Sequence, residues 1–237
     1  MRLDKFVADA AQLTRSAARS LIAKGRVTVN GQVCKKADCA LREGDSVCAD
    51  GKPLACEEYV YIMLNKPAGV VSASTDGRDK TVVDLVGGAF PRRQLFPAGR
   101  LDKTSTGFVL LTDDGAFAHD ILAPKRHVPK TYRVVLDAPV TPAMVEAFAA
   151  GVTLADGQTM QPALLIPDET DPFAATVVLR QGVYHQIKRM FGVLDAGVNQ
   201  LHRTAIGGLA LDEGLAPGAW RLITPEEKAL IQAGGEG

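Results

Sequence analysis

The sequence lacks the long hydrophobic runs and the leader that are typical of membrane and secreted proteins. No apolar stretch among its 237 residues approaches the ~20 residues that a membrane-spanning helix needs. The first ten residues, MRLDKFVADA, carry charges at positions 2, 4 and 5 and no apolar centre, so they do not resemble a signal peptide. We therefore predict a cytoplasmic protein with no membrane partner.

The sequence is also poor in groups that hold metals or form disulfides. Its four cysteines, at positions 34, 39, 48 and 56, include no closely spaced pair of the kind that zinc sites use. A disulfide framework is not expected in a chain of this length without a secretory signal, so we predict free thiols. The four histidines have no ligand spacing, and no metal site is expected.

An excess of charge of either sign is missing from the chain as a whole. Lys and Arg number 27, as do Asp and Glu, so the formal net charge is zero. The distribution is uneven, because residues 10–37 contain no acidic side chain. Residues 1–55 carry ten basic and six acidic residues, a net charge of +4, which leaves −4 for the remainder. A basic N-terminal module on a mildly acidic body predicts a local nucleic-acid footprint.

The N-terminal residues predict a compact module of two helices and a hairpin. Leu3, Phe6 and Val7 recur at helical spacing, and Thr14 is a predicted N-cap for a second helix that ends at Gly25. RVTVNGQV alternates around an Asn-Gly turn, which predicts a hairpin, and REGDSVCADG predicts a further turn and strand. The polar stretch 50–58, DGKPLACEE, predicts a linker between domains at 1–55 and 59–232.

The rest of the chain mixes predicted strands and helices without strict alternation. Strands are predicted at 59–65, 108–112, 131–137, 162–166, 174–180 and 208–211. Helices are predicted at 116–123, 141–150, 183–194 and 225–233, and the final AGGEG is expected to be a loose tail. This order predicts an α+β fold with a mixed, largely antiparallel sheet flanked by helices.

Three polar clusters interrupt these elements. Asp102 lies in GRLDKTSTGFVLLTDDG, ahead of an apolar strand, and Tyr132 lies at the strand start KTYRVV. Lys188 and Arg189 lie on the partly apolar helix within GVYHQIKRMFGVL. Taken singly, Asp102 is typical of a surface turn, Tyr132 of a half-buried sheet position, and the two cations of a solvated helix face.

Taken together and in order, the segments resemble a known family. RLDKFVADA and RSAARSLIAKGRVTVNGQ resemble the S4 (alpha-L) RNA-binding domain. LNKPAGVVSAS, GRLDKTSTGFVLLTDDG, KTYRVV and YHQIKRMFGVLDAGVNQLHRTAIGGLAL resemble the successive motifs of the RsuA family of pseudouridine synthases. The resemblance covers nearly the whole chain and implies an S4 domain followed by a pseudouridine synthase domain.

The third motif also bears on the substrate. Family members that act on the large ribosomal subunit more often carry Arg-Asn-Arg-Gln-Val-Arg-Arg-Met, whereas Tyr184 and His185 here replace the Asn-Arg pair and Lys188 replaces the first arginine of the later pair. The resemblance thus implies a monomeric enzyme that converts uridine to pseudouridine in 16S ribosomal RNA, of the position-516 type. The RNA could be free or part of a small-subunit assembly intermediate.

Two alternatives stay open. One is a synthase that acts on 23S ribosomal RNA, and the other is a non-catalytic RNA-binding factor in ribosome assembly. A non-catalytic relative would be expected to lose the carboxylate, the tyrosine or the cation of the site, and this sequence keeps all three.

The implied chemistry explains the residue types. Pseudouridine forms by cleavage of the N1–C1′ bond of uridine, rotation of the uracil and attachment through C5, with positive charge developing on the sugar. The resemblance gives Asp102 the catalytic role, either attack on C1′ or removal of the C2′ proton, and Lys188 the role of holding it ionised. Tyr132 would stack on the base and help to remove the C5 proton. Uracil is both leaving group and returning nucleophile, so no metal or organic cofactor is needed.

The remaining candidates are assigned to RNA binding and to support of the site. The target uridine must leave its stack, which costs a few kcal/mol. Lys66 and Pro67 are expected to support the site structurally, and His185 is a further candidate for RNA contact. The predicted RNA-binding residues are basic or histidine: Arg2, Lys5, Arg15, Arg19, Lys24, Arg26, Arg100, Arg189, His202 and Arg203.

Overall fold

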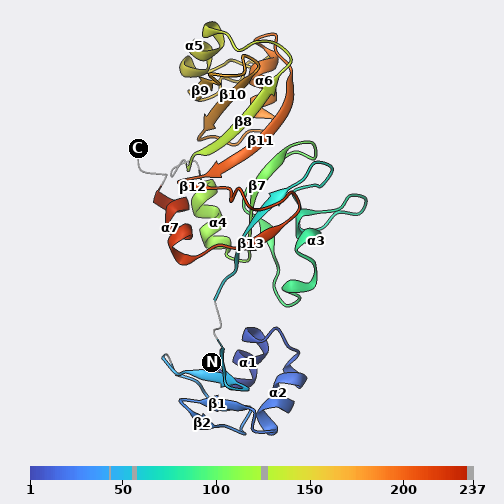
Figure 1. Cartoon of the computed structure of the whole chain (residues 1–237), viewed down its shortest axis with the longest axis vertical. Coiled ribbons are helices and arrows are strands. Elements are labelled where there is room, and N and C mark those ends of the chain that lie inside the picture. The colour runs from blue at the N-terminus through green and yellow to red at the C-terminus, as the bar shows by residue number, and fades with distance from the viewer. Residues whose placement is uncertain (43, 55–57, 124–127, 234–237) are drawn as a thin grey trace. The chain divides into compact units, whose positions relative to one another are not determined.

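The chain forms two compact units, each with its own buried core (Figure 1). The computed structural model describes residues 1–42, 44–54, 58–123 and 128–233. The N-terminal unit comprises Met1–Tyr59 and Gly88–Arg93, and the C-terminal unit comprises Val60–Gly87 and Gln94–Gly237. Within the described ranges, no helix is both long enough and apolar enough to cross a membrane.

The N-terminal unit packs two helices against a small antiparallel sheet. Helices α1 (Leu3–Ala10) and α2 (Arg15–Ala23) accompany strands in the order β2-β1-β3-β4. As predicted, the Thr14 hydroxyl caps α2 by accepting a hydrogen bond from the Ala17 amide. The predicted hairpin is confirmed as β1 (Val27–Val29) and β2 (Gln32–Val33), with Asn30 and Gly31 both at positive φ, as a tight hairpin turn requires.

The stretch predicted as a linker is partly structured. Asp50 and Gly51, both at positive φ, turn the chain between β3 (Val47–Ala49) and β4 (Lys52–Leu54), which pair antiparallel. The prediction was wrong for these residues because Asp-Gly has the same turn chemistry as Asn-Gly. The rest of that stretch includes residues 55–57, and with them Cys56, which lie outside the described residues, as do most of the predicted tail and Glu43.

The C-terminal unit is built on a nine-stranded sheet. Among the described strands, β7 and β11 run parallel and the other neighbours run antiparallel, which confirms the predicted α+β class. The main path runs through β13 (Trp220–Leu222), β5 (Tyr61–Lys66), β7 (Thr106–Thr112), β11 (Val198–Ile206), β8 (Lys130–Leu136), β10 (Ala174–Leu179) and β9 (Leu164–Pro167). Short strands β6 (Phe96–Pro97) and β12 (Leu209–Ala210) pair with β7 and β11.

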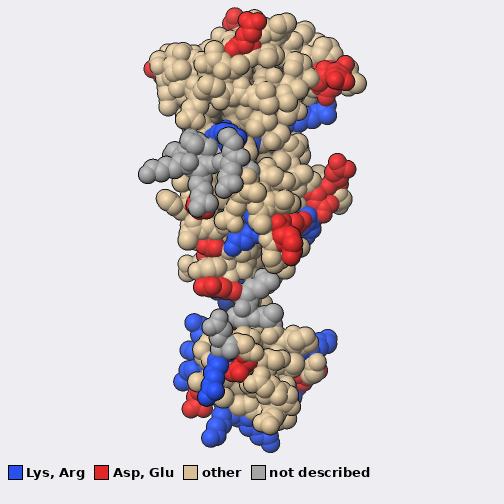
Figure 2. Space-filling view, turned by 90° about the vertical axis from the view of Figure 1, so that its left-hand side faces the viewer, with Lys and Arg blue, Asp and Glu red and all other residues tan. Residues whose placement is uncertain are grey.

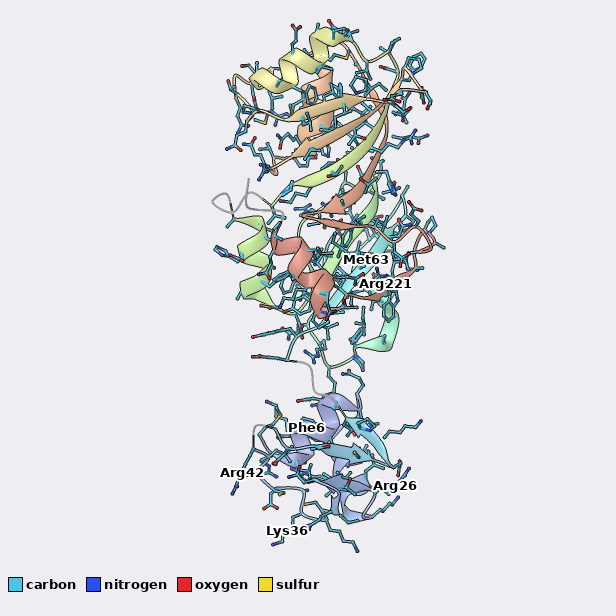
Figure 3. All side chains as sticks on the ribbon, turned by 60° about the vertical axis from the view of Figure 1, so that its left-hand side comes forward. Phe6, Arg26, Lys36, Arg42, Met63 and Arg221 are labelled. Atoms are coloured by element: carbon cyan, nitrogen blue, oxygen red, sulfur yellow. The ribbon has the colours of Figure 1, made fainter. Side chains whose placement is uncertain are left out.

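The helices of this unit cover two separate parts of the sheet (Figure 1). Helices α5 (Pro142–Ala150) and α6 (Gln186–Gly192) enclose one core with β8 and β10, in which Phe148 packs on Phe191. Helices α4 (Gly115–Leu122) and α7 (Pro225–Ala233) enclose a second core with β5 and β7, which holds Met63 (Figure 3). The short α3 (Val82–Val86) and the 3-10 turn Gly87–Ala89 lie before β6.

Two elements near the centre of the sheet differ from the sequence prediction. Strand β11 was not predicted, although its nine residues separate β7 from β8. Helix α6 begins at Gln186 rather than at residue 183, because His185 has a left-handed backbone with φ 50°. That conformation is uncommon outside glycine, and Tyr184 and His185 form a turn directly before the helix.

Candidate active site

The backbone of the loop that carries Asp102 is held by the buried ammonium group of Lys66. Lys66, at the end of β5, has a fully buried side chain. Its ammonium donates hydrogen bonds to the carbonyl oxygens of Pro67 at 3.0 Å, Lys103 at 3.3 Å and Ser105 at 2.7 Å. Two of these carbonyls, those of Lys103 and Ser105, follow Asp102 closely in the chain. The Lys66 ammonium therefore bonds to the loop backbone, and its role in supporting the site stays a prediction.

Two further contacts fix the path of this loop into β7. The Ser72 hydroxyl donates to the Leu101 carbonyl at 2.9 Å and accepts from the Leu101 amide at 3.0 Å. Gly107 has φ 99°, and a Cβ atom there would lie 2.3 Å from the carbonyl oxygen of Arg203 on β11. Glycine is thus required where β7 and β11 approach each other, immediately after the loop.

Asp102 lies between two potential cations from the α6 region. One carboxylate oxygen, Oδ1, is 3.2 Å from Nε2 of His185, and the other, Oδ2, is 3.7 Å from Nζ of Lys188. The Lys188 ammonium also donates to the Thr104 hydroxyl at 3.0 Å, which ties α6 to the Asp102 loop. About a quarter of the Asp102 side chain is exposed, so an external molecule can reach it.

The sequence predicted the partner Lys188 and missed the contact with His185. His185 was considered only as a candidate for RNA contact, and it carries positive charge toward Asp102 only when protonated. The exposed Tyr184 ring stacks on the His185 ring with centroids 3.8 Å apart. A signal was present, since both residues depart from the Asn-Arg pair that is more common in members acting on the large subunit. The left-handed backbone of His185 could not be inferred from the local sequence pattern.

Tyr132 and Arg203 occupy paired positions across β8 and β11. Opposed residues of antiparallel strands direct their side chains to the same face of the sheet. Arg203 is also the register partner of Gly107, so one line of residues connects β7, β11 and β8. Tyr132 is partly buried beside the core under α6. Two strand spacings of ~4.8 Å separate the position of Tyr132 on β8 from that of Gly107 on β7.

Arg203 itself corrects a prediction. Its side chain is buried, with 2% of the residue exposed, and its Nε donates to the Phe108 carbonyl at 2.6 Å. A buried guanidinium cannot make the surface RNA contact predicted for it. Arg203 instead supports β7 from β11, and one terminal nitrogen of its side chain has no hydrogen-bond partner within the described residues.

The interior next to the loop is rich in positive charge. Burial lowers the pKa of Lys66 to about 8, while the nearby Asp102 charge opposes this shift and Arg203 adds to it. Burial, with a smaller effect of Arg203, also lowers the pKa of Lys130 to about 8. Lys66 therefore lies within electrostatic reach of both Asp102 and Arg203, and Lys130 lies within reach of Arg203.

The other predicted contacts of this unit fall into three kinds. Arg100 is exposed beside the loop. Arg189 is ion-paired with Asp156 and is therefore not a free cation. His202 is half-buried, with Nδ1 2.8 Å from the Thr106 hydroxyl, and burial lowers its pKa.

A cavity of about 210 Å³ lies beside the Asp102 loop. Its lining residues are Thr104, Ser105, Lys188, Val198, Asn199 and Leu201.

The predicted RNA-binding cations of the N-terminal unit are exposed, and Lys and Arg are numerous on its surface (Figure 2). Figure 3 shows Arg26, Lys36 and Arg42 on different sides of this unit. Arg26 is paired with Asp50, its Nε 2.6 Å from Oδ1. Lys5 and Lys24 are also exposed. Arg2, Arg15 and Arg19, in contrast, converge on a single carboxylate.

This arrangement is suited to chemistry that develops positive charge. An accessible carboxylate on a rigid loop, held by cations, can stabilise a cationic centre, attack it or accept a proton from its neighbour. Within the described residues, no three His, Cys, Asp or Glu side chains come together in a way that could hold a metal ion.

Comparisons with known proteins agree with the resemblance. The RNA pseudouridylate synthase family matches residues 60–192 and the S4 domain matches residues 1–47. The chain is 41% identical to ribosomal small subunit pseudouridine synthase A of Escherichia coli (strain K12), over 98% of this chain and 100% of that protein. It is 38% identical to an uncharacterized RNA pseudouridine synthase of Bacillus subtilis, over 98% of each. A crystal structure of a pseudouridylate synthase, 37% identical, matches with a TM-score of 0.69 and covers 98% of this chain and 99% of that one. The chain therefore belongs to the RNA pseudouridylate synthase family and carries an S4 domain at its N-terminal end.

Proposed function

We propose that this protein converts one uridine of 16S ribosomal RNA to pseudouridine, at a site of the position-516 type. The substrate is suggested by the likeness to the ribosomal small subunit enzyme, which extends over essentially the full length of both chains. The observation that carries the catalytic assignment is the Asp102 carboxylate, accessible on its anchored loop and 3.7 Å from Lys188.

Asp102 acts at the ribose in this proposal. The N1–C1′ bond breaks with its electron pair passing to the uracil, and positive charge develops at C1′. The carboxylate then either bonds to C1′ or takes the C2′ proton. After the uracil turns, C5 bonds to C1′; the bond from Asp102 to C1′ breaks in the first case, and the proton returns to C2′ in the second. The C5 proton is released and N1 takes up a proton, so the product is an isomer of uridine. Uracil is both leaving group and nucleophile, so the atoms balance without a cofactor.

The neighbouring groups keep the carboxylate in its reactive form. A flipped base covering Asp102 would exclude water and favour the neutral acid, and the charge of Lys188 opposes that change. Tyr132, on the line of residues that runs from the loop to β8, would stack on the base and assist removal of the C5 proton. Arg100, which is exposed next to Leu101 and Asp102 in the chain, would contact a phosphate of the flipped nucleotide.

Pseudouridine mapping in both ribosomal RNAs tests the proposal. Cells with and without the gene are compared, and complementation with the Asp102→Asn variant provides the matched control. We expect loss of one pseudouridine in 16S RNA, restored by the wild type and not by the variant. Loss of a 23S position would assign the enzyme to the large subunit. Unchanged maps combined with a ribosome-assembly defect would indicate a non-catalytic factor.

A further inference from the structure

Asp4 is a buried charge, whereas the other acidic residues that the structure describes in this unit are exposed or half-buried. It lies in the first turn of α1, and its side chain is fully buried. Three arginines surround it: Nε of Arg2 is 3.1 Å and Nη2 of Arg15 3.9 Å from Oδ1, and Nε of Arg19 is 3.0 Å from Oδ2. Hydrogen bonds, chiefly from Arg2, lower the pKa of Asp4 to about 2 against the effect of burial. Asp4 is therefore anionic at neutral pH.

The charges of this cluster do not cancel. Three guanidinium groups face one carboxylate, which leaves a net charge of three minus one, or +2. Each of these arginine side chains is about half exposed, at 51%, 50% and 54%, while the carboxylate has no exposed surface. A guanidinium has five N–H donors, so most donors remain available to an anion on the solvent side. Arg26 and Asp50, in comparison, form a neutral one-to-one pair in which both side chains are exposed.

The geometry also reduces the cost of binding. Arg2 precedes α1, whereas Arg15 and Arg19 lie on α2, one turn apart. A free arginine side chain loses up to ~2 kcal/mol of rotamer entropy when it is ordered. Arginines already held by a buried carboxylate lose less, and their planar groups match phosphate oxygens.

We propose that Asp4 is a positioning residue that holds Arg2, Arg15 and Arg19 as one preformed surface for RNA backbone phosphates. This proposal rests on the proposed RNA substrate and adds how the N-terminal unit binds the RNA backbone. Phosphate contacts do not depend on base sequence, so the surface binds any RNA of suitable shape.

The proposal is tested by the direction in which RNA affinity changes when the Asp4 charge is removed. Asp4→Asn keeps the size of the side chain and adds one net positive charge, and Asp50→Asn adds the same charge at the exposed pair. If charge alone set RNA affinity, both variants would bind RNA more tightly. Positioning predicts that Asp4→Asn binds about three- to tenfold more weakly while Asp50→Asn binds equally or more tightly. Fluorescence anisotropy with the full-length protein measures both, on a 16S fragment and on an unrelated RNA hairpin.

Salt dependence provides a second readout. Each lost phosphate contact lowers the slope of log K against log salt by about 0.7–0.9. We expect a slope smaller by about one for Asp4→Asn and an unchanged slope for Asp50→Asn. Equal or tighter binding by Asp4→Asn with an unchanged slope would overturn the proposal. Because the hairpin needs no modification site, a failure of the proposed 16S activity would leave this result interpretable.

A second substitution covers the case in which Asp4→Asn unfolds the N-terminal unit, as seen by circular dichroism. Arg19→Lys keeps the charge, loses the planar Nε donor to Asp4 and leaves Arg2 and Arg15 in place. Arg26→Lys makes the same change at the exposed pair. A loss of affinity at least threefold larger for Arg19→Lys supports the proposal, and equal effects of the two variants overturn it.

Discussion

Replacing Lys188 by methionine should lower the rate of the enzyme, and the size of the loss depends on how far solvent screens Asp102 and Lys188. The variant keeps most of the aliphatic stem and removes the charge 3.7 Å from Oδ2 of Asp102. Breaking an ion pair sealed from water costs roughly 3–5 kcal/mol. Here 31% of the Lys188 side chain and 25% of the Asp102 side chain are exposed, and His185 is a second partner. Two charges 3.7 Å apart interact by about 1 kcal/mol in water and about 4 at an effective dielectric of 20.

The interaction of Asp102 with Lys188 lies toward the lower end of the range from about 1 to 4 kcal/mol, because solvent screens the pair. We expect a loss of about 1–2 kcal/mol of transition-state stabilisation, or a five- to thirtyfold lower single-turnover rate. Release of tritium from C5-labelled uridine in a 16S transcript measures this rate. The matched control is Lys103→Met, which removes a neighbouring cation whose ammonium lies 2.7 Å from Asp79.

The combination with His185→Gln adds a further test. If both groups hold Asp102, the double variant loses more activity than either single one. A Lys188→Met rate within twofold of the wild type, and no lower than that of Lys103→Met, would refute the pairing of Asp102 with Lys188.

Three other predictions concern the residues that support the site. Gly107→Ala should destabilise the fold by about 3 kcal/mol or more, because the added Cβ would lie 2.3 Å from the Arg203 carbonyl oxygen and the backbone has φ 99°. The control is Gly115→Ala at the start of α4, where an added Cβ meets open space, and it should be neutral or stabilising. Thermal unfolding of both variants measures the difference. Equal melting temperatures would contradict this. Lys66→Met should lower turnover without weakening RNA binding, because it releases three backbone carbonyls around Asp102. The pKa of Lys66 is lowered to about 8, so between pH 8 and about 10.4 the unfolded chain binds more protons at this residue than the folded chain does. The cost of burying the charged ammonium is present below pH 8 and is relieved above it. The stability of the wild type, measured by urea unfolding, should therefore rise relative to that of Lys66→Met across this pH window. Parallel pH profiles of the two proteins would contradict this reading.

Local chemistry made much of the fold predictable. The Thr14 cap, the Asn-Gly turn and the apolar run of β7 each specify an element through a few neighbouring residues, and each was found. The Asp102–Lys188 contact was predicted because the ordered motifs imply it, although the two residues are far apart in the chain.

What the sequence did not predict depends on contacts between distant segments. Strand β11 breaks its register twice, between Val198 and Gln200 and between Arg203 and Ala205, so its side chains do not alternate in the pattern that identifies strands. Arg203 looked like a surface cation because nothing near it in sequence shows that it is buried at the centre of the sheet, on a strand between β7 and β8. The His185 contact depends on a left-handed backbone that its neighbours do not specify.

Asp102→Asn is the most direct test of the central claim. The variant keeps the size of the side chain and its capacity for hydrogen bonding, and it removes the charge that faces Lys188 and would face C1′. Single-turnover tritium release and RNA affinity are measured on the same 16S transcript. We expect no detectable turnover, with RNA affinity within about threefold of the wild type, since the phosphate contacts lie elsewhere. Retention of a tenth or more of the wild-type rate would contradict the assignment of Asp102 as the essential group.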